Sequence, residues 1–163
     1  MKLPQIISQK IYDLPGIINQ VNRWRLLGKS ISFTNGCFDI LHQGHIASLS
    51  DAAREADMLI VGLNSDASTR RLKGRARPIN GEKARATILA ALLMVDAVII
   101  FDEDTPLSLI CSVRPDVLVK GGDYALEQIV GAREVMDWGG RVVINPIVPG
   151  FSTSALIEKI TKL

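Results

Sequence analysis

Cysteine is scarce in this chain of 163 residues, which holds only Cys37 and Cys111. Two cysteines provide neither a disulfide framework nor the ligand spacing of a metal site, so we expect a reducing, cytoplasmic setting. Long apolar runs are missing as well. The longest of them are far shorter than a membrane span, and the first residues lack the apolar core of a signal peptide. These absences predict a protein with no membrane partner.

Net charge is small, at +2 from 19 basic and 17 acidic residues, so composition does not indicate a nucleic-acid partner. Basic residues nevertheless gather between positions 70 and 85, where Glu82 is the only acid. They are Arg70, Arg71, Lys73, Arg75, Arg77, Lys83 and Arg85. A local basic cluster in a nearly neutral chain favours a small anionic ligand over a long polyanion. We expect a basic loop, residues 68–80, that is mobile until an anion binds, because its like charges repel.

Neither a Gly-x-x-x-x-Gly-Lys-Ser/Thr segment nor a Gly-x-Gly-x-x-Gly segment is present, which leaves a P-loop or a dinucleotide site unsupported. The segment Thr34–His45 offers another kind of phosphate site, because it follows a short apolar run and precedes a predicted helix. Helix N-termini carry free N–H groups and the positive end of the helix dipole. The chain's only two histidines, His42 and His45, fall in this segment. A metal site lacks further ligands nearby, and we favour phosphate binding over a purely structural pair.

Apolar runs alternate with helical patterns along the chain. The runs at 30–34, 58–63, 97–100, 117–119 and 141–144 predict strands. This alternation predicts a single α/β domain with a Rossmann-like, doubly wound parallel sheet of about five strands. Residues 3–28 carry an apolar stripe at helical spacing that is interrupted at Pro15-Gly16, which predicts two helical pieces. We therefore expect an N-terminal helical segment, 1–29, before the main domain, 30–163. The segment either packs on the sheet or forms a dimer contact.

Ligands of such sheets bind beyond the carboxyl ends of the strands, and polar clusters follow three of the predicted strands. They are Thr34–His45, Asn64–Asp66 and Lys120–Asp123. Asp39 is expected either to form a turn or cap, or to accept hydrogen bonds from substrate hydroxyls. Arg85 has two expected roles also, an anion contact or a structural ion pair with Asp66.

The same segments resemble a known family. His-x-Gly-His at 42–45 resembles the signature of the nucleotidylyltransferase superfamily, and Gly150–Ser154 is similar to its second, hydroxyl-rich motif. Further phrases resemble the D-glycero-β-D-manno-heptose 1-phosphate adenylyltransferases. They stand at 61–66, 71–74, 77–80, 103–106 and 115–124. The length is similar to the stand-alone form of the adenylyltransferase domain that also occurs in a bifunctional heptose kinase/adenylyltransferase.

This resemblance implies transfer of AMP from ATP to the heptose 1-phosphate. The products would be ADP-heptose and pyrophosphate, in a step of lipopolysaccharide inner-core synthesis. It also implies Mg²⁺ with ATP and a homodimer, with no metal ligand from the protein. Two alternatives stay open. One is a related enzyme of the glycerol-phosphate cytidylyltransferase or FMN adenylyltransferase type, and the other is a nucleotide-binding module without turnover.

The expected site residues, some read from the residues themselves and the others carried over by motif position, form three groups. Nucleotide binding is expected from Thr34, Asn35, Gly36, Phe38, His42, His45, Lys120, Gly121, Asp123, Ser152, Thr153 and Ser154. Catalysis is expected from His42, His45 and Lys73. Substrate binding is expected from Asp39, Asp66, Lys73, Arg75 and Arg85. Positioning and charge stabilisation suffice for an attack by an anionic phosphate oxygen, so no covalent enzyme intermediate is expected.

Overall fold

A computed structural model describes residues 4–122, 124–146 and 150–162. Its centre is one six-stranded sheet in which every pairing is parallel, in the order β1-β4-β3-β2-β5-β6. The strands are β1 (Ile11–Tyr12), β2 (Ile31–Gly36), β3 (Met58–Asn64), β4 (Ala97–Phe101), β5 (Val117–Gly121) and β6 (Arg141–Asn145). The predicted doubly wound sheet is confirmed, with one strand more than the five expected.

The extra strand lies in the N-terminal segment, which the apolar stripe predicted to be wholly helical. The structure instead has α1 (Gln5–Gln9), then β1, then α2 (Leu14–Leu26). β1 pairs with β4 at the sheet edge. A strand of two residues shows no alternation, so Ile11 fitted the helical spacing equally well. Asp13 caps α2 by accepting from the Gly16 N–H at 2.8 Å, which accounts for the interruption at Pro15-Gly16.

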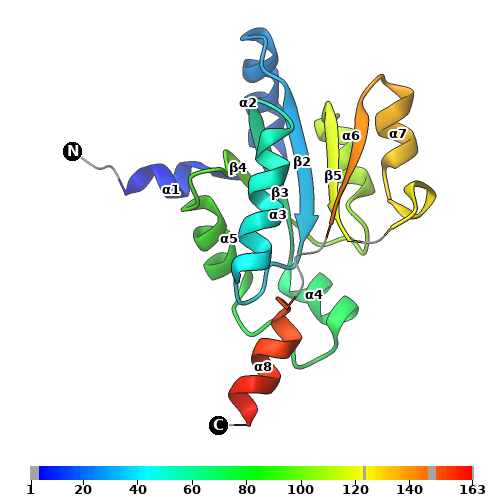
Figure 1. Ribbon diagram of the computed structural model, residues 1–163. Helices are drawn as coiled ribbons and strands as arrows, with labels where there is room; N and C mark the ends of the chain where they lie inside the picture. The colour runs from blue at the N-terminus through cyan, green and yellow to red at the C-terminus, as the bar shows by residue number, and fades with distance from the viewer. Residues whose placement is uncertain (1–3, 123, 147–149, 163) are drawn as a thin grey trace.

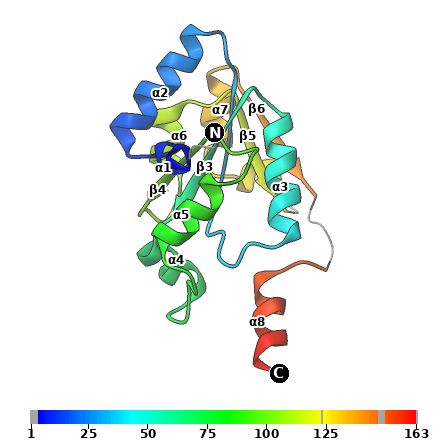
Figure 2. The ribbon, with the colours of Figure 1, turned by 90° about the vertical axis from the view of Figure 1, so that its left-hand side faces the viewer.

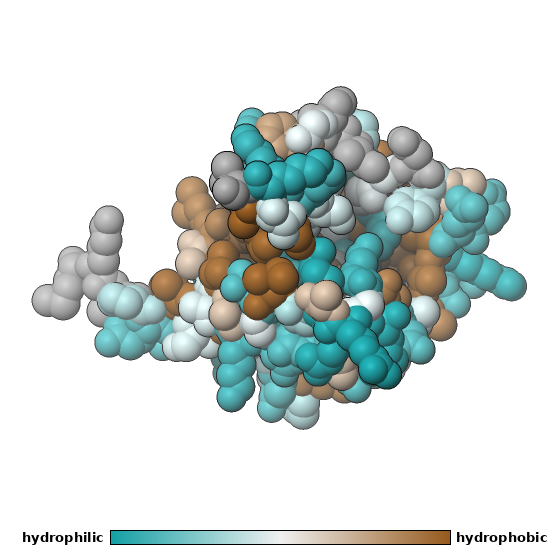
Figure 3. Space-filling model, turned by 90° about the horizontal axis from the view of Figure 1, so that it is seen from below, coloured by the Kyte–Doolittle hydropathy of each residue, from teal (hydrophilic) through white to brown (hydrophobic). Residues whose placement is uncertain are grey.

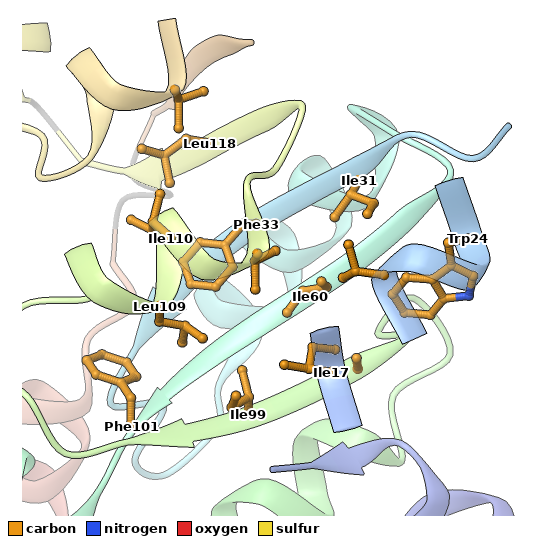
Figure 4. Close-up of a cluster of buried hydrophobic side chains, with 14 of the residues drawn as sticks. Ile17, Trp24, Ile31, Phe33, Ile60, Ile99, Phe101, Leu109, Ile110 and Leu118 are labelled. Carbon is orange, nitrogen blue, oxygen red and sulfur yellow. The ribbon is translucent and has the colours of Figure 1, made fainter. Parts of the chain in front are cut away.

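Helices cover both faces of the sheet, and strand residues alternate between the two cores (Figure 1). On one face α2, α6 (Leu107–Val113) and α7 (Ala132–Asp137) pack against Ile31 and Phe33, which are fully buried (Figure 4). On the other face α3 (Gln43–Arg54) and α5 (Glu82–Ala90) pack against Leu59, Val61 and Leu63. Because successive side chains of a strand point to opposite faces, the near-continuous apolar runs of the sequence fill both layers.

Several shorter elements gather at the edge where the strands end. α4 (Asp66–Lys73) and α8 (Thr153–Thr161) lie beyond the arrowhead of β2 in Figure 1, and the 3₁₀ helix η1 (Leu126–Gln128) follows β5. α8 projects away from the sheet in both ribbon views (Figures 1 and 2), and none of its residues is buried. Within the described ranges, no helix combines the length and the apolar character needed to cross a membrane.

α4 corrects the expected loop, because the first half of that segment is helical. Ser65 is its N-cap, and the Ser65 hydroxyl accepts from the Ser68 N–H at 2.9 Å. Serine, threonine and aspartate near the start lower the helix propensity of this stretch, which hides the helix from a periodicity search. The Ser65 cap was the signal available.

The strand order reverses between β2 and β5. β3 and β4 lie on one side of β2, whereas β5 and β6 lie on the other. Such a switch point opens a crevice at the carboxyl ends of the two central strands. Thr34–Gly36 and Lys120–Gly121 meet at this place.

Candidate functional site

A cavity of about 730 Å³ lies at the switch point. Its wall combines the ends of β2 and β5, the start of α3, the basic segment and the start of α8. Figure 3 views the molecule from the side on which the strands end, where hydrophobic and hydrophilic surface lie close together. Thirteen of the expected site residues line this one cavity: Thr34, Asn35, Gly36, Phe38, Asp39, His42, His45, Lys73, Lys120, Gly121, Ser152, Thr153 and Ser154.

Three expected substrate residues lie outside the cavity lining, and Asp123 lies outside the described residues. Arg75 is exposed. Asp66 lines a separate, more open hollow beside α4 and α5. Arg85 is 1% exposed and surrounded by protein.

The two histidines are held against each other at the start of α3. His42 is the N-cap, and its Nδ1 accepts from the His45 N–H at 3.4 Å. The two rings stack with centroids 3.9 Å apart. Gly44 makes this packing possible, because a Cβ there would lie 3.0 Å from both the His42 ring and Phe151 Cβ. The glycine of the His-x-Gly-His segment therefore serves a close approach between α3 and the chain entering α8.

Both histidines are neutral near pH 7. The pKa of His45 is lowered to about 4. Burial is the largest cause, and the neighbouring His42 adds a lowering that exceeds the rise caused by Asp39. Burial also lowers the pKa of His42. Since Nδ1 of His42 accepts a hydrogen bond, the neutral ring carries its proton on Nε2. The pair can thus donate hydrogen bonds to an anion without being cationic beforehand.

Lys120 lines the same cavity as the two histidines. Its Nζ lies 3.5 Å from Asn35 Oδ1 and 5.9 Å from the centre of the Tyr124 ring. Burial lowers the pKa of Lys120. Of its charged neighbours, Cys37 raises this pKa and Lys73 lowers it. Lys120 forms no ion pair with a carboxylate among the described residues. A desolvated cation without a counter-ion favours an anionic ligand.

Both carboxylate oxygens of Asp39 accept hydrogen bonds from the protein. Oδ2 accepts from Arg77 Nε at 2.8 Å and from the Ile79 N–H at 2.7 Å, and Oδ1 accepts from the Asn80 N–H at 3.0 Å. Burial opposes ionisation, but these bonds outweigh it and keep the pKa of Asp39 below its usual value. Of the two roles expected for Asp39, this geometry favours the turn over the acceptance of substrate hydroxyls.

The backbone around Asp39 is strained. Phe38 and Ile40 both adopt left-handed conformations, with φ of 45° and 52°. Such values are unusual for bulky residues and rare for a β-branched one. They persist only where the surrounding contacts fix the chain, and they concentrate at binding sites.

Arg85 forms the structural ion pair that was one of its two expected roles. Its Nη2 donates to Asp66 Oδ1 at 2.8 Å, and Nε donates to the Asn80 carbonyl at 2.9 Å. Nη1 donates to the carbonyls of Cys37 and Asn64. One buried guanidinium thereby joins the loops that follow β2 and β3 to the end of the basic segment. For this reason we assign Arg85 and Asp66 to the support of the site rather than to substrate contact.

The hydroxyl-rich motif caps α8. The Ser152 hydroxyl accepts from the Ala155 N–H at 3.1 Å. The Thr153 hydroxyl donates to the Asp39 carbonyl at 2.9 Å, which ties the start of α8 to the turn between β2 and α3. This anchor brings free helix N–H groups to the cavity.

Some cavity residues were not among the expected ones. They include Ser48, Asn64, Arg77, Tyr124, Gln128, Ile129, Val130 and Phe151. Arg77 was visible as one of seven basic residues, but nothing in the sequence separated it from Arg75. Tyr124 and Phe151 lie within the recognised segments 115–124 and Gly150–Ser154, so membership of these segments was the available signal. Gln128 in η1, and Ile129 and Val130 directly after it, belong to no sequence pattern that indicates a binding site.

A parallel sheet with a phosphate-binding turn at its switch point, two neutral histidines and a capped helix defines a nucleotide-binding α/β protein. The sequence model of the cytidylyltransferase-like family matches residues 33–159, and the chain belongs to this family. The prediction of a nucleotidyltransferase is confirmed at this level.

Curated relatives are similar over nearly the whole chain. Bifunctional protein HldE of Koribacter versatilis is 56% identical over 154 residues, which cover 94% of this chain and 32% of the relative. Bifunctional protein HldE of Hyphomonas neptunium is 58% identical over 149 residues, which cover 91% and 31%. The chain thus spans about a third of the length of these relatives.

Two solved structures share the fold. A lipopolysaccharide core biosynthesis protein from Thermoplasma volcanium is 31% identical with a TM-score of 0.59, covering 74% of this chain and 98% of that one. Pantoate-beta-alanine ligase from Francisella tularensis has a TM-score of 0.60, covering 94% of this chain and 78% of that one. At 17% identity, the second likeness shows the fold alone.

Proposed function

We propose that this protein transfers AMP from ATP to D-glycero-β-D-manno-heptose 1-phosphate, giving ADP-heptose and pyrophosphate for the lipopolysaccharide inner core. The observation that carries the proposal is the single cavity in which His42, His45, Lys73, Lys120 and the start of α8 meet. Similarity to bifunctional protein HldE supports the choice of substrate. So does similarity to the lipopolysaccharide core biosynthesis protein from Thermoplasma volcanium.

In the proposed reaction a phosphate oxygen of the sugar phosphate attacks the α-phosphorus of ATP. The new P–O bond forms as the bond from the α-phosphorus to the bridging oxygen breaks, and pyrophosphate leaves with that electron pair. The attacking oxygen is already anionic, so no general base has to remove a proton. The demands on the protein are alignment of two anions and stabilisation of the charge that leaves.

The cavity residues meet these demands in different ways. Nε2–H of His42 donates to phosphate oxygens as a neutral group, and His45 supplies a second imidazole that stacks on the first. Lys73 and Lys120 supply the positive charge. Ser152–Ser154 and the N–H groups at the start of α8 bind the outer phosphates. Asn35, Gly36 and Phe38 hold the nucleotide beside β2, where Gly36 lets the backbone approach it closely.

Mg²⁺ would enter this reaction with the nucleotide. Among the described residues, no three His, Cys, Asp or Glu side chains are grouped as a metal site. Asp39 is committed to hydrogen bonds, and Asp104, which also lines the cavity, pairs with Arg71 at 2.6 Å. The residues that the structure describes therefore do not form a Mg²⁺ site of their own. A cation held chiefly by substrate phosphates is the usual arrangement for Mg²⁺.

A panel of nucleoside triphosphates and phosphate acceptors, assayed by pyrophosphate release, tests the proposal. ATP with the heptose 1-phosphate is expected to give the highest kcat/KM. A preference for CTP with glycerol phosphate, or for ATP with FMN, would assign the other related activity instead. Binding of ATP without product from any acceptor would indicate a nucleotide-binding module. Intact-protein mass spectrometry with ATP is expected to show no nucleotide on the protein.

Assembly is a separate part of the proposal. We expect a homodimer in the cytoplasm, and sedimentation equilibrium measures the mass of the particle directly. A monomer at all concentrations would contradict the dimer without affecting the assignment of the reaction.

A further inference from the structure

Arg77 lies in the cavity wall with only one edge of its guanidinium engaged. Nε donates to Asp39 Oδ2 at 2.8 Å, and the side chain is 15% exposed. Within the described part of the chain, Arg77 makes no other side-chain hydrogen bond or ion pair. The two terminal nitrogens, which carry four N–H groups, thus have no protein acceptor there.

The engaged edge is held rigidly. Asp39 has a fully buried side chain and also binds the N–H groups of Ile79 and Asn80, just after Arg77. Asn80 is fixed in turn by Arg85, through the bond from Arg85 Nε to its carbonyl at 2.9 Å. The guanidinium is therefore oriented before any ligand arrives. A donor fixed in this way loses less conformational entropy on binding.

The cavity that Arg77 lines carries further positive charges. Lys73, Lys120 and Arg77 all line the cavity, and Lys120 has no carboxylate partner in the described ranges. Among the described residues, the lining carboxylates are Asp39, already bonded, and Asp104, paired with Arg71. A planar fork of N–H donors in a positive cavity matches the oxygens of a phosphate group.

We propose that Arg77 is a phosphate-binding residue of this cavity and that Asp39 is the positioning residue that orients it. This inference rests on the proposed nucleotidyl transfer and adds to it a contact that the family resemblance did not assign. The phosphate belongs either to the tail of ATP or to the acceptor. Both present the same chemistry, and the experiment distinguishes them.

The test compares Arg77→Gln with Arg70→Gln. Glutamine at 77 can still donate an N–H to Asp39, but the positive charge and the second donor edge are lost. Arg70 is the matched control, because it belongs to the same basic segment but is exposed on α4 and outside the cavity. Calorimetry measures binding of ATP, of pyrophosphate, and of inorganic phosphate to the ATP-loaded protein. Circular dichroism verifies that both variants are folded.

We expect Arg77→Gln to weaken binding roughly ten- to hundredfold, the range for a charged hydrogen bond. Arg70→Gln should stay within about twofold, as for a solvated surface charge. Loss for ATP and pyrophosphate assigns Arg77 to the nucleotide, and loss for inorganic phosphate alone assigns it to the acceptor. Equal binding of all three probes by Arg77→Gln and the wild type overturns the proposal. These measurements need no turnover, so a wrong sugar substrate would leave them valid.

The positioning role of Asp39 has its own readout. Asp39→Asn is measured alone and combined with Arg77→Gln, and we expect it to weaken phosphate binding only when Arg77 is present. If the two substitutions weakened phosphate binding independently, so that their effects added, Asp39 would have only a general structural role. Should Asp39→Asn not fold, Arg77→Lys takes its place, because lysine keeps the charge without a guanidinium that can bind Asp39 and phosphate together. Wild-type binding by Arg77→Lys would show that orientation is unimportant.

Discussion

At the scale of single residues, the neutral state of His42 leads to a specific prediction. His42→Ala and His45→Ala should each lower kcat by roughly a hundredfold, because each removes a donor to the leaving charge. His42→Gln should retain more activity than His42→Asn, since the glutamine amide reaches nearer to the position of Nε2, which bears the proton. Steady-state pyrophosphate release measures all four variants. Unchanged kcat in an alanine variant would remove that histidine from the mechanism.

The buried ring of His45 also makes stability depend on pH. The pKa of His45 is about 4 in the folded chain, whereas the pKa of a histidine in an unfolded chain is about 6.5. Between these values the unfolded chain binds more protons, so the free energy of unfolding falls as the pH is lowered through this window. Above it both states are neutral, and this contribution is fully present.

Thermal melts from pH 4 to 8 examine this dependence in the wild type and in His45→Gln. The Tm of the wild type should fall more steeply below about pH 6.5, because it has one more buried imidazole to protonate on unfolding than the variant, whereas His42 contributes to both curves. Above that pH the two curves should run parallel. Parallel curves over the whole range would mean that His45 is not the group responsible.

At the scale of elements, Arg85 on α5 joins three segments around the cavity. Arg85→Met should lower the free energy of unfolding by about 3–5 kcal/mol, because it leaves Asp66 and several carbonyls without their buried partner. Lys83→Met on the same helix is the control, since Lys83 is exposed, and should change it by less than about 0.5 kcal/mol. Urea unfolding followed by circular dichroism measures both. Similar values for the two variants would contradict the joining role.

The elements differ in how far the sequence predicted them. The apolar run 58–63 predicted β3 well, because a strand buried on both faces has a clear composition. β1 was missed, since two residues at a sheet edge show no period of their own. α4 was missed because its cap and first turn are polar. In these cases tertiary pairing or capping, rather than periodicity, determined the structure.

At the scale of the whole molecule, the proposed entry of Mg²⁺ with the nucleotide predicts that a chelator affects turnover and not the stability of the fold. Chelation with EDTA should abolish pyrophosphate release yet leave the Tm of the nucleotide-free protein unchanged. Adding Mg²⁺ with ATP should raise the Tm, because a ligand that binds only the folded state stabilises it. Differential scanning calorimetry gives each value. A lower Tm with EDTA alone would reveal a metal held by the protein itself.

The site as a whole was predictable where its residues are close in sequence. Thr34–His45 could be recognised because strand, turn and helix start follow one another directly. The bond from Asp39 to Arg77 could not be foreseen, since it depends on how the basic segment returns to the turn after β2. Likewise, only the folded chain shows that Phe151 lies against Gly44. Contacts between residues far apart in the sequence therefore account for most of the site that could not be predicted.

The parallel order of the sheet has a consequence for biosynthesis. Strand β2 is completed by β5, which follows β3, β4 and their helices in the chain. A growing chain emerges from the ribosome with its N-terminal part first, so β2 waits with an open edge until β5 has been made. Such an edge invites pairing with other chains. The cavity closes last, when Ser152–Ser154 have emerged, so a ligand that binds there cannot assist the earlier stages of folding.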